Sequence, residues 1–214
     1  MRIEDIMSRT PISAAPEASL AELEHLMARH HVHHVPIVQD GRLLGMVAHQ
    51  DLLAARPSPV TTLTRGEVNY LLERVTARQI MKPHPVVCSP DTLVEEAGLL
   101  LRRHGIGSLP VLESQRLVGM VTTEDILDFF LDITGCSGDQ GSRVALKLSD
   151  RRGSLTQLLA VFNELGAYVA TLISPTRQDE AGRRVMVIRF RAEQPATVVA
   201  GLRERGYDIL HEVD

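Results

Sequence analysis

The sequence has little of several residue types that mark particular classes of protein. It has no tryptophan, three tyrosines and four phenylalanines among 214 residues, so it offers few aromatic rings on which single-stranded bases could stack. Its two cysteines, Cys88 and Cys136, are too few for a disulfide framework and lack the spacing of a zinc site. This cysteine usage favours a reducing compartment.

The chain also lacks an excess of basic charge and long apolar runs. The formal net charge is -4, so no overall positive field draws the chain to a nucleic acid backbone. No apolar run approaches the roughly 18 residues of a membrane-spanning helix. Residues 1–7 carry acids where a signal peptide would carry basic residues. We therefore expect a cytoplasmic globular protein that binds neither nucleic acid nor membrane.

An internal repeat organises the first two thirds of the chain. Short motifs recur at an offset of 74 residues, as between Pro36 and Pro110. The paired motifs are Ile6-Met7 and Ile80-Met81, Pro11 and Pro85, Pro16 and Pro90, Val35-Pro36 and Leu109-Pro110, Gly45-Met46-Val47 and Gly119-Met120-Val121, and Asp51 and Asp125. One departure is expected at two predicted capping boxes, Ser19 with Glu22 and Thr92 with Glu95, which are offset by 73.

Both copies follow the same hydrophobic pattern. An amphipathic helix is predicted around residues 20–27 and again around 93–101, each followed by two short β-branched runs. In the first copy an Asp-Gly pair at residues 40–41 is typical of a hairpin turn. A helix starting near Gln50 or Glu124 closes each β-α-β-β-α unit, and two units are expected to pack face to face. A third capping box, at residues 64–67, opens a helix that we assign to the second copy.

These two units resemble a tandem pair of CBS domains, the Bateman module. The resemblance rests on the openings Asp5-Ile-Met7 and Gln79-Ile-Met81, the apolar strands at Pro36 and Pro110, and the endings Gly-Met-Val-x-x-x-Asp. It covers residues 1 to about 133. It implies a regulatory module, usually associated as a two-fold disc of four CBS domains.

A separate domain is predicted after a glycine-rich linker at residues 135–142. The remaining pattern, residues 143–214, reads β-α-β-β-α-β, and it resembles an ACT domain through residues 148–155 and 164–169. Arg152 stands where that motif usually has proline, and Tyr168 stands where amino-acid-binding members often have asparagine. Whether this domain binds an amino acid stays open. A CBS pair followed by an ACT domain looks like the acetoin-utilisation AcuB-type proteins.

The predicted fold class is therefore α/β (α+β), a tandem CBS pair followed by a ferredoxin-like βαββαβ ACT domain. The boundaries are residues 1–60 for the first CBS domain, 61–134 for the second, 135–142 for the linker and 143–214 for the ACT-like domain.

The candidate ligand site lies at the end of the second repeat. Thr122 ends a strand and Asp125 follows in the first helical turn, where a carboxylate can accept hydrogen bonds from both ribose hydroxyls. In CBS domains the Ser/Thr-x-x-Asp motif holds the ribose and phosphate of an adenosine ligand, and the resemblance maps it onto these residues. The alternative is that both residues only cap the helix. The first repeat keeps Asp51 but has Ala48 at the hydroxyl position, so its site is expected to be weaker or empty.

Further groups were assigned to this site by their nearness in sequence. Phosphate donors are expected at the end of the preceding helix, and the adenine is expected among apolar groups. These residues are Arg102, Arg103 and His104 for the phosphate, and Ile106, Leu109, Pro110, Val86 and Val87 for the adenine.

Four histidines lie within residues 29–34. Imidazoles can bind zinc, copper or nickel, but neighbouring side chains at a helix end and a strand start point apart. We expect a polar or phosphate-facing loop and no metal.

The leading hypothesis is a non-catalytic sensor of an adenine nucleotide or derivative, namely AMP, ADP, ATP or S-adenosylmethionine, that acts on a regulated protein partner. The alternatives are an enzyme that uses the histidines and a structural dimerisation protein with a vestigial cleft. No common catalytic motif is present. A homodimer is predicted because only one of Phe129 and Phe130 can enter the core of its own unit, and because a final strand at residues 207–210 is free to pair.

Overall fold

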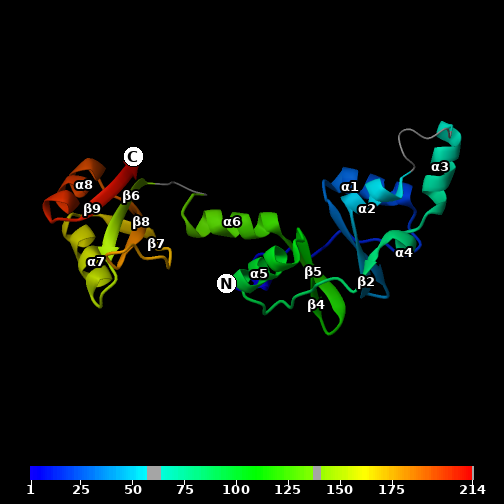
Figure 1. Ribbon diagram of the computed structural model, residues 1–214, viewed down its shortest axis with the longest axis horizontal. Coiled ribbons are helices and arrows are strands. Elements are labelled where there is room, and N and C mark those ends of the chain that lie inside the picture. Colours follow the sequence, from blue (N-terminus) through cyan, green and yellow to red (C-terminus); the bar gives the residue numbers. More distant parts are fainter. Residues whose placement is uncertain (57–63, 137–140, 214) are drawn as a thin grey trace. The chain divides into compact units, whose positions relative to one another are not determined.

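The computed structural model describes residues 1–56, 64–136 and 141–213. It divides into two compact units, Met1–Leu127 and Asp128–Asp214 (Figure 1). The division falls inside a helix, before the predicted linker, of which residues 137–140 lie outside the described residues. Among the described residues, no helix combines the length and apolar character needed to cross a membrane.

The first unit contains the repeat, and its elements keep one spacing. The first copy consists of η1 (Ile3–Asp5), α1 (Leu20–His30), β1 (His34–Gln39), β2 (Arg42–Ala48) and α2 (His49–Ala55). The second copy consists of α4 (Ala77–Ile80), β3 (Lys82–Pro83), α5 (Val94–His104), β4 (Ser108–Glu113), β5 (Arg116–Thr122) and α6 (Thr123–Ile133). Helices α1 and α5, and both hairpins, begin and end 74 residues apart.

The two long helices start differently although their positions match. In α1 the Glu22 N–H donates to Ser19 Oγ at 3.2 Å, and the Ser19 N–H donates to the Glu22 carboxylate at 2.7 Å, so this capping box is confirmed. The box predicted at Thr92 is wrong, because Thr92 Oγ1 instead accepts the Ser89 N–H at 3.0 Å in the preceding turn. Helix α5 therefore starts one residue later, at Val94, and the expected offset of 73 disappears.

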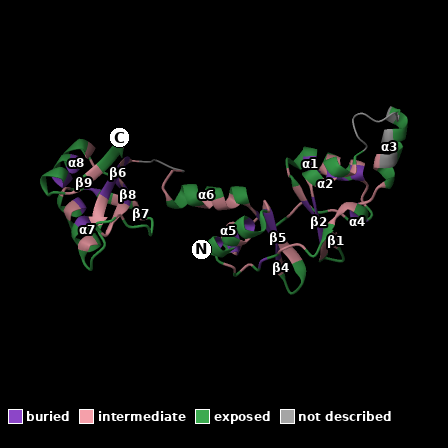
Figure 2. Ribbon diagram, in the orientation of Figure 1, coloured by how far each residue is buried: buried purple, intermediate pink, exposed green. Residues whose placement is uncertain are grey.

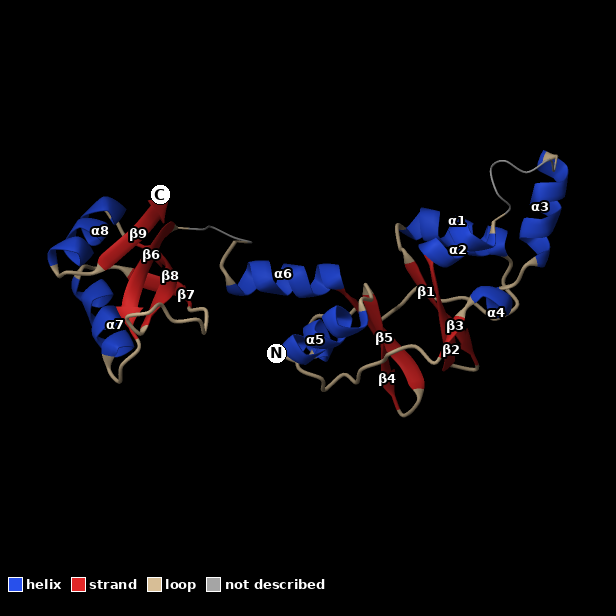
Figure 3. Ribbon diagram, in the orientation of Figure 1, coloured by secondary structure: helices blue, strands red, loops and turns tan. Residues whose placement is uncertain are grey.

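Each hairpin is closed by a two-residue turn. Asp40 and Gly41 have φ values of 53° and 79°, and Ser114 and Gln115 have φ values of 47° and 67°. Two consecutive positive φ angles match the twist of antiparallel strands, so the Asp-Gly prediction is confirmed. The hairpins join at Arg42 and Arg116 into a sheet with the order β1-β2-β5-β4, in which β3 also pairs with β2 (Figure 3).

The opening segment of each repeat lies against the hairpin of the other. Ser8 exchanges two backbone hydrogen bonds with Met120 of β5, at 2.9 and 3.0 Å. In the same way, Lys82 and Pro83 of β3 pair with Met46 and Gly45 of β2. Two glycines permit this approach, since a Cβ on Gly119 would lie 2.9 Å from the Ser8 carbonyl oxygen and one on Gly45 would lie 2.8 Å from that of Lys82.

Helix α3 (Arg65–Arg74) belongs to the first repeat, which corrects its assignment to the second. Its residue Leu72, and Val75 just after it, pack against the core of the first repeat. The Leu20 N–H also donates to the Val75 carbonyl at 2.9 Å. The buried members of that core are Leu20, Leu23, Met27, Val35, Ile37, Val47, Leu52 and Ala77 (Figure 2).

The second unit has the predicted β-α-β-β-α-β order. Its elements are β6 (Ser142–Ser149), α7 (Ser154–Glu164), β7 (Tyr168–Ile173), β8 (Arg183–Arg191), α8 (Pro195–Glu204) and β9 (Asp208–Val213). The strands form an antiparallel sheet with the order β7-β8-β6-β9. Both helices bury apolar residues against it, and Phe162 of α7 meets Phe190 of β8 edge to face, with ring centroids 5.4 Å apart.

Candidate functional site

Two cavities in the first unit have matching linings. We call them the Asp125 cavity and the Asp51 cavity, and their volumes are about 380 and 510 Å³. Both volumes fall in the range that small-molecule ligands occupy. Pro11, Met120 and Asp125 line the first, and their counterparts 74 residues away, Pro85, Met46 and Asp51, line the second.

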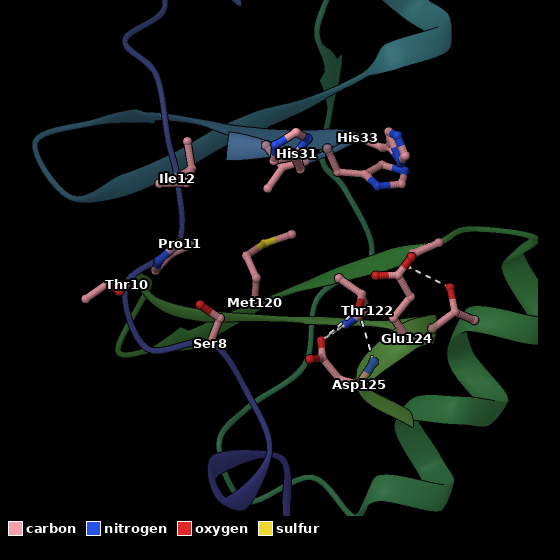
Figure 4. Close-up of a pocket in the computed structure, with 14 residues that line it drawn as sticks. Ser8, Thr10, Pro11, Ile12, His31, His33, Met120, Thr122, Glu124 and Asp125 are labelled. Atoms are coloured by element: carbon pink, nitrogen blue, oxygen red, sulfur yellow. Dashed lines mark hydrogen bonds between the residues drawn. The ribbon is translucent and has the colours of Figure 1, made fainter. Parts of the chain in front are cut away.

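The Asp125 cavity is built from both repeats. Its walls are residues 8 and 10–12 of the first opening segment, residues 31–34 after α1, and the junction of β5 with α6. Figure 4 shows Met120 between the opening segment and Thr122, with His31 and His33 on the opposite side from Asp125. The lining mixes apolar side chains, such as Ile12 and Val32, with hydroxyl and carboxylate groups.

Thr122 and Asp125 bond to each other at this junction. The Thr122 N–H and Oγ1–H both donate to Asp125 Oδ2, at 2.6 and 2.8 Å, and the Asp125 N–H donates to Thr122 Oγ1 at 3.2 Å. These bonds cap α6, so the alternative interpretation describes a contact that is present. Both residues also line the cavity and are half-buried. In the described parts of the chain no ion pair engages Asp125, and no hydrogen bond uses its Oδ1.

The Asp51 cavity has a different electrostatic character. The Asp51 carboxylate accepts the Ala48 N–H on Oδ2 at 2.8 Å and forms an ion pair through Oδ1 with Lys82 Nζ at 2.9 Å. Five imidazoles line the same cavity, those of His33, His34, His49, His84 and His104. Burial lowers the pKa of His34, and the nearby His33 and Lys82 lower it further, against an opposing effect of Asp51.

The structure divides the predicted site residues between the two cavities. Thr122 and Asp125 lie in one, and Asp51, Val86, Ile106 and His104 lie in the other. Four predicted residues line neither cavity: Leu109 and Pro110 are buried in β4, and Arg102 and Arg103 are exposed at the end of α5. The grouping by sequence nearness is therefore corrected.

The physical reason for this division is the exchange of opening segments between repeats. Residues 8–12 of the first repeat reach the end of β5, far from it in sequence, and occupy the place expected for Val86. Their match to residues 82–86 was visible in the sequence, in the paired Pro11 and Pro85. That pairing could have identified both segments as cavity walls, although not which cavity each one lines.

The histidine-rich segment ends α1 and enters β1. His31 caps α1 with a left-handed φ of 54°, and the His33 ring lies 6.0 Å from the His49 ring. His33 and His34, together with Gly107, line both cavities. Within residues 1–56, 64–136 and 141–213, no three His, Cys, Asp or Glu side chains are placed to hold a metal ion together.

Comparison with known proteins identifies the repeats. The family model of the CBS domain matches residues 3–58 and 77–132. A CBS domain-containing protein of Dictyostelium discoideum is 30% identical over 133 residues, which are 61% of this chain and 92% of that protein. L-aspartate semialdehyde sulfurtransferase of Methanocaldococcus jannaschii is 28% identical over 60% of this chain, but over only 23% of its own length.

Solved structures give the same result. The structure from Vibrio cholerae that is named for acetoin utilization (AcuB) is 28% identical, covers 62% of this chain and 92% of its own, and has a TM-score of 0.53. The CBS domain pair of protein MJ0100, solved with 5′-methylthioadenosine and S-adenosyl-L-methionine, is 27% identical over 61% of this chain and 95% of its own, with a TM-score of 0.50. The two repeats of this chain are a tandem pair of CBS domains, and the chain belongs to the CBS domain family.

Proposed function

We propose that this protein is a cytoplasmic, non-catalytic regulator that senses an adenosine-type ligand in its Asp125 cavity. The ligands we consider are AMP, ADP, ATP and S-adenosylmethionine. The observation that carries the proposal is the position of Asp125, whose Oδ2 is held by Thr122 while Oδ1 makes no bond in the described chain. A ribose presents two neighbouring hydroxyl donors, and a carboxylate acceptor binds such donors strongly.

The helix cap and the ligand site support each other. Because Thr122 fixes Asp125 through Oδ2, the orientation of the carboxylate is set before a ligand arrives, which lowers the entropic cost of binding. The apolar part of the lining, with Ile12, Val32 and Met120, suits an adenine ring. The solved CBS pair of MJ0100 contains two adenosine derivatives, which supports the same ligand class here.

Regulation requires that a ligand bind two states of the protein with different affinity. The two cavities share His33, His34 and Gly107 as lining, so a ligand in one changes the surroundings of the other. We propose that this coupling alters how the CBS pair packs, and through it what the second unit or a protein partner can do.

For the second unit we propose a ferredoxin-like fold of the ACT type. Its β-α-β-β-α-β order and its antiparallel sheet order β7-β8-β6-β9 support this assignment. Tyr168, which takes the position of the usual asparagine, is 67% exposed at the start of β7. An amino acid ligand is therefore not part of the proposal.

We also propose a homodimer. Helix α6 is amphipathic but has no buried residue, and Phe130 is 52% exposed while Phe129 is half-buried. The expectation that one of the two would enter the core is thus corrected, and both remain available to a second subunit. Light scattering at micromolar concentration should give twice the chain mass of 23.6 kDa, and a value equal to the chain mass would refute the dimer.

Calorimetry with adenosine and 5′-methylthioadenosine tests the ligand site, because neither probe carries phosphate. Replacing Asp125 by alanine should cost about 1.5–3 kcal/mol, or roughly 10- to 150-fold in Kd, because a hydrogen bond to a charged group is lost. A control variant on the same helix, Asp128→Ala, removes an exposed carboxylate outside the cavity and should leave Kd unchanged. Equal affinity of the wild type and Asp125→Ala would overturn the assignment.

A thermal-shift screen of AMP, ADP, ATP, S-adenosylmethionine and NAD then ranks the natural candidates. A ligand at 100 times its Kd adds about 2.7 kcal/mol to the stability of the folded state. The screen separates a sensor from a protein with a vestigial cleft, since the latter would show no shift with any of them.

A further inference from the structure

We propose that the Asp51 cavity binds the phosphate chain of a nucleoside di- or triphosphate, whereas the Asp125 cavity takes an uncharged or cationic adenosine derivative. The inference deepens the proposed function and rests on it only in treating both cavities as ligand sites. It is carried by the different charges that the two repeats place at matching positions around the same backbone.

The Asp51 cavity contains an ammonium group whose pairing leaves it able to bind phosphate. Lys82 Nζ lies 2.9 Å from Asp51 Oδ1, and the Lys82 side chain is 63% exposed. An exposed ion pair of this kind contributes little stability, and an ammonium has three donors, so Lys82 can keep Asp51 and still donate to a phosphate oxygen. Lysine is a common phosphate ligand in proteins because it acts as a compact positive charge.

Asp51 itself is poorly placed to recognise ribose. Its Oδ2 accepts the Ala48 N–H, and its Oδ1 faces Lys82, so both carboxylate oxygens already have donors. Asp51 is also the one carboxylate among the described residues that line this cavity, and Lys82 neutralises it. The negative charge that would repel a phosphate is therefore largely cancelled.

The imidazoles add further donors around the same space. His84 lies two residues after Lys82, and His104 ends α5, where they border the cavity together with His33, His34 and His49. Neutral imidazole donates one hydrogen bond and protonated imidazole donates two. A chain of two or three phosphates has enough oxygen atoms to use several of these donors, whereas a monophosphate does not.

The Asp125 cavity has the opposite character at the matching positions. Ser8 replaces Lys82, Thr10 replaces His84 and Thr123 replaces His49, while Glu124 adds a carboxylate where the first repeat has Gln50. No lysine or arginine belongs to the described lining of this cavity. Glu124 and Asp125 would repel a polyphosphate, but they would tolerate a neutral thioether or attract a sulfonium.

The probe that tests this inference is inorganic tripolyphosphate, which contains no nucleoside. Calorimetry of the full chain should show binding that weakens as salt rises, and Lys82→Ala should weaken it by about tenfold or more because a charged contact is lost. Lys82→Arg keeps the charge and should retain most of the affinity. The matched control is Ser8→Ala, at the equivalent position of the other cavity, which should leave tripolyphosphate binding unchanged.

The outcomes separate this inference from the proposed function. Tripolyphosphate binding that depends on Lys82 supports the inference even where adenosine fails to bind at Asp125, which would refute only the proposed function. No binding of tripolyphosphate at millimolar concentration, or equal binding by the wild type and Lys82→Ala, overturns the inference while adenosine binding stays intact. Circular dichroism of Lys82→Ala verifies the fold, which should be unchanged because this side chain is exposed.

Discussion

The two CBS repeats share their backbone but differ in the side chains that face their cavities. Matching strands, turns and helices recur at one spacing, and even the irregularity between Ile37 and Val38 recurs between Val111 and Leu112. At the end of the hairpin, however, Thr122 and Glu124 of one repeat stand opposite Ala48 and Gln50 of the other. A duplicated fold thus supplies two identical frames, and a few substitutions at the rim give each frame its own chemistry.

The largest expected effect concerns the part that the repeats share. Gly45→Ala and Gly119→Ala each place a Cβ closer than 3.0 Å to a backbone carbonyl of the opening segment of the other repeat. Overpacking of this kind costs typically about 1–3 kcal/mol, so both variants should lower the unfolding free energy by similar amounts in chemical denaturation.

The control for this pair is Gly98→Ala in α5, where the nearest atom to an added Cβ is Ile126 Cγ2 at 3.7 Å. Alanine is favoured over glycine inside a helix by about 0.5–1 kcal/mol, so this variant should be neutral or more stable. A large loss at Gly119 and none at Gly45 would show that the exchange of opening segments is not symmetric.

A smaller effect is expected where the repeats differ by one hydroxyl. Thr122→Ala removes the side-chain cap of α6 and should cost about 0.5–2 kcal/mol of stability. The reverse change, Ala48→Thr, introduces the hydroxyl beside Asp51 and should recover part of that amount in α2. Thermal denaturation of both variants measures the difference, and a loss of stability in Ala48→Thr would show that the first repeat cannot accommodate the cap.

The smallest expected effect is a pH dependence centred on His34, whose counterpart is Ser108. Burial lowers the pKa of His34, aided by the charges of His33 and Lys82 and opposed by that of Asp51. The unfolded chain therefore binds a proton more readily, so the contribution of His34 to stability is present above its ordinary pKa of about 6.5 and is lost as the pH falls through that value.

Chemical denaturation between pH 7.5 and 5.5 measures this effect. His34→Ser, which makes the repeats alike at this position, should reduce the loss of unfolding free energy on acidification. An identical pH slope in the wild type and the variant would show that another group is responsible.

The sequence by itself determined the repeat, its helices and its hairpin turns, because these depend on local signals. Asp40 and Gly41 accept positive φ angles, and Ser19 caps α1 through its own side chain. The same signals predicted the order of elements in the second unit and placed Thr122 and Asp125 at the junction of a strand with a helix.

Only the tertiary structure decided which residues share a cavity. The opening segment of each repeat pairs with the hairpin of the other, so Ser8 lies beside Met120 and Lys82 lies beside Asp51. Nothing local distinguishes this arrangement from one in which each segment stays with its own repeat, because both arrangements satisfy the same hydrophobic pattern. The choice depends on close approach at Gly45 and Gly119, where the absence of a side chain matters only once the partner backbone is in place.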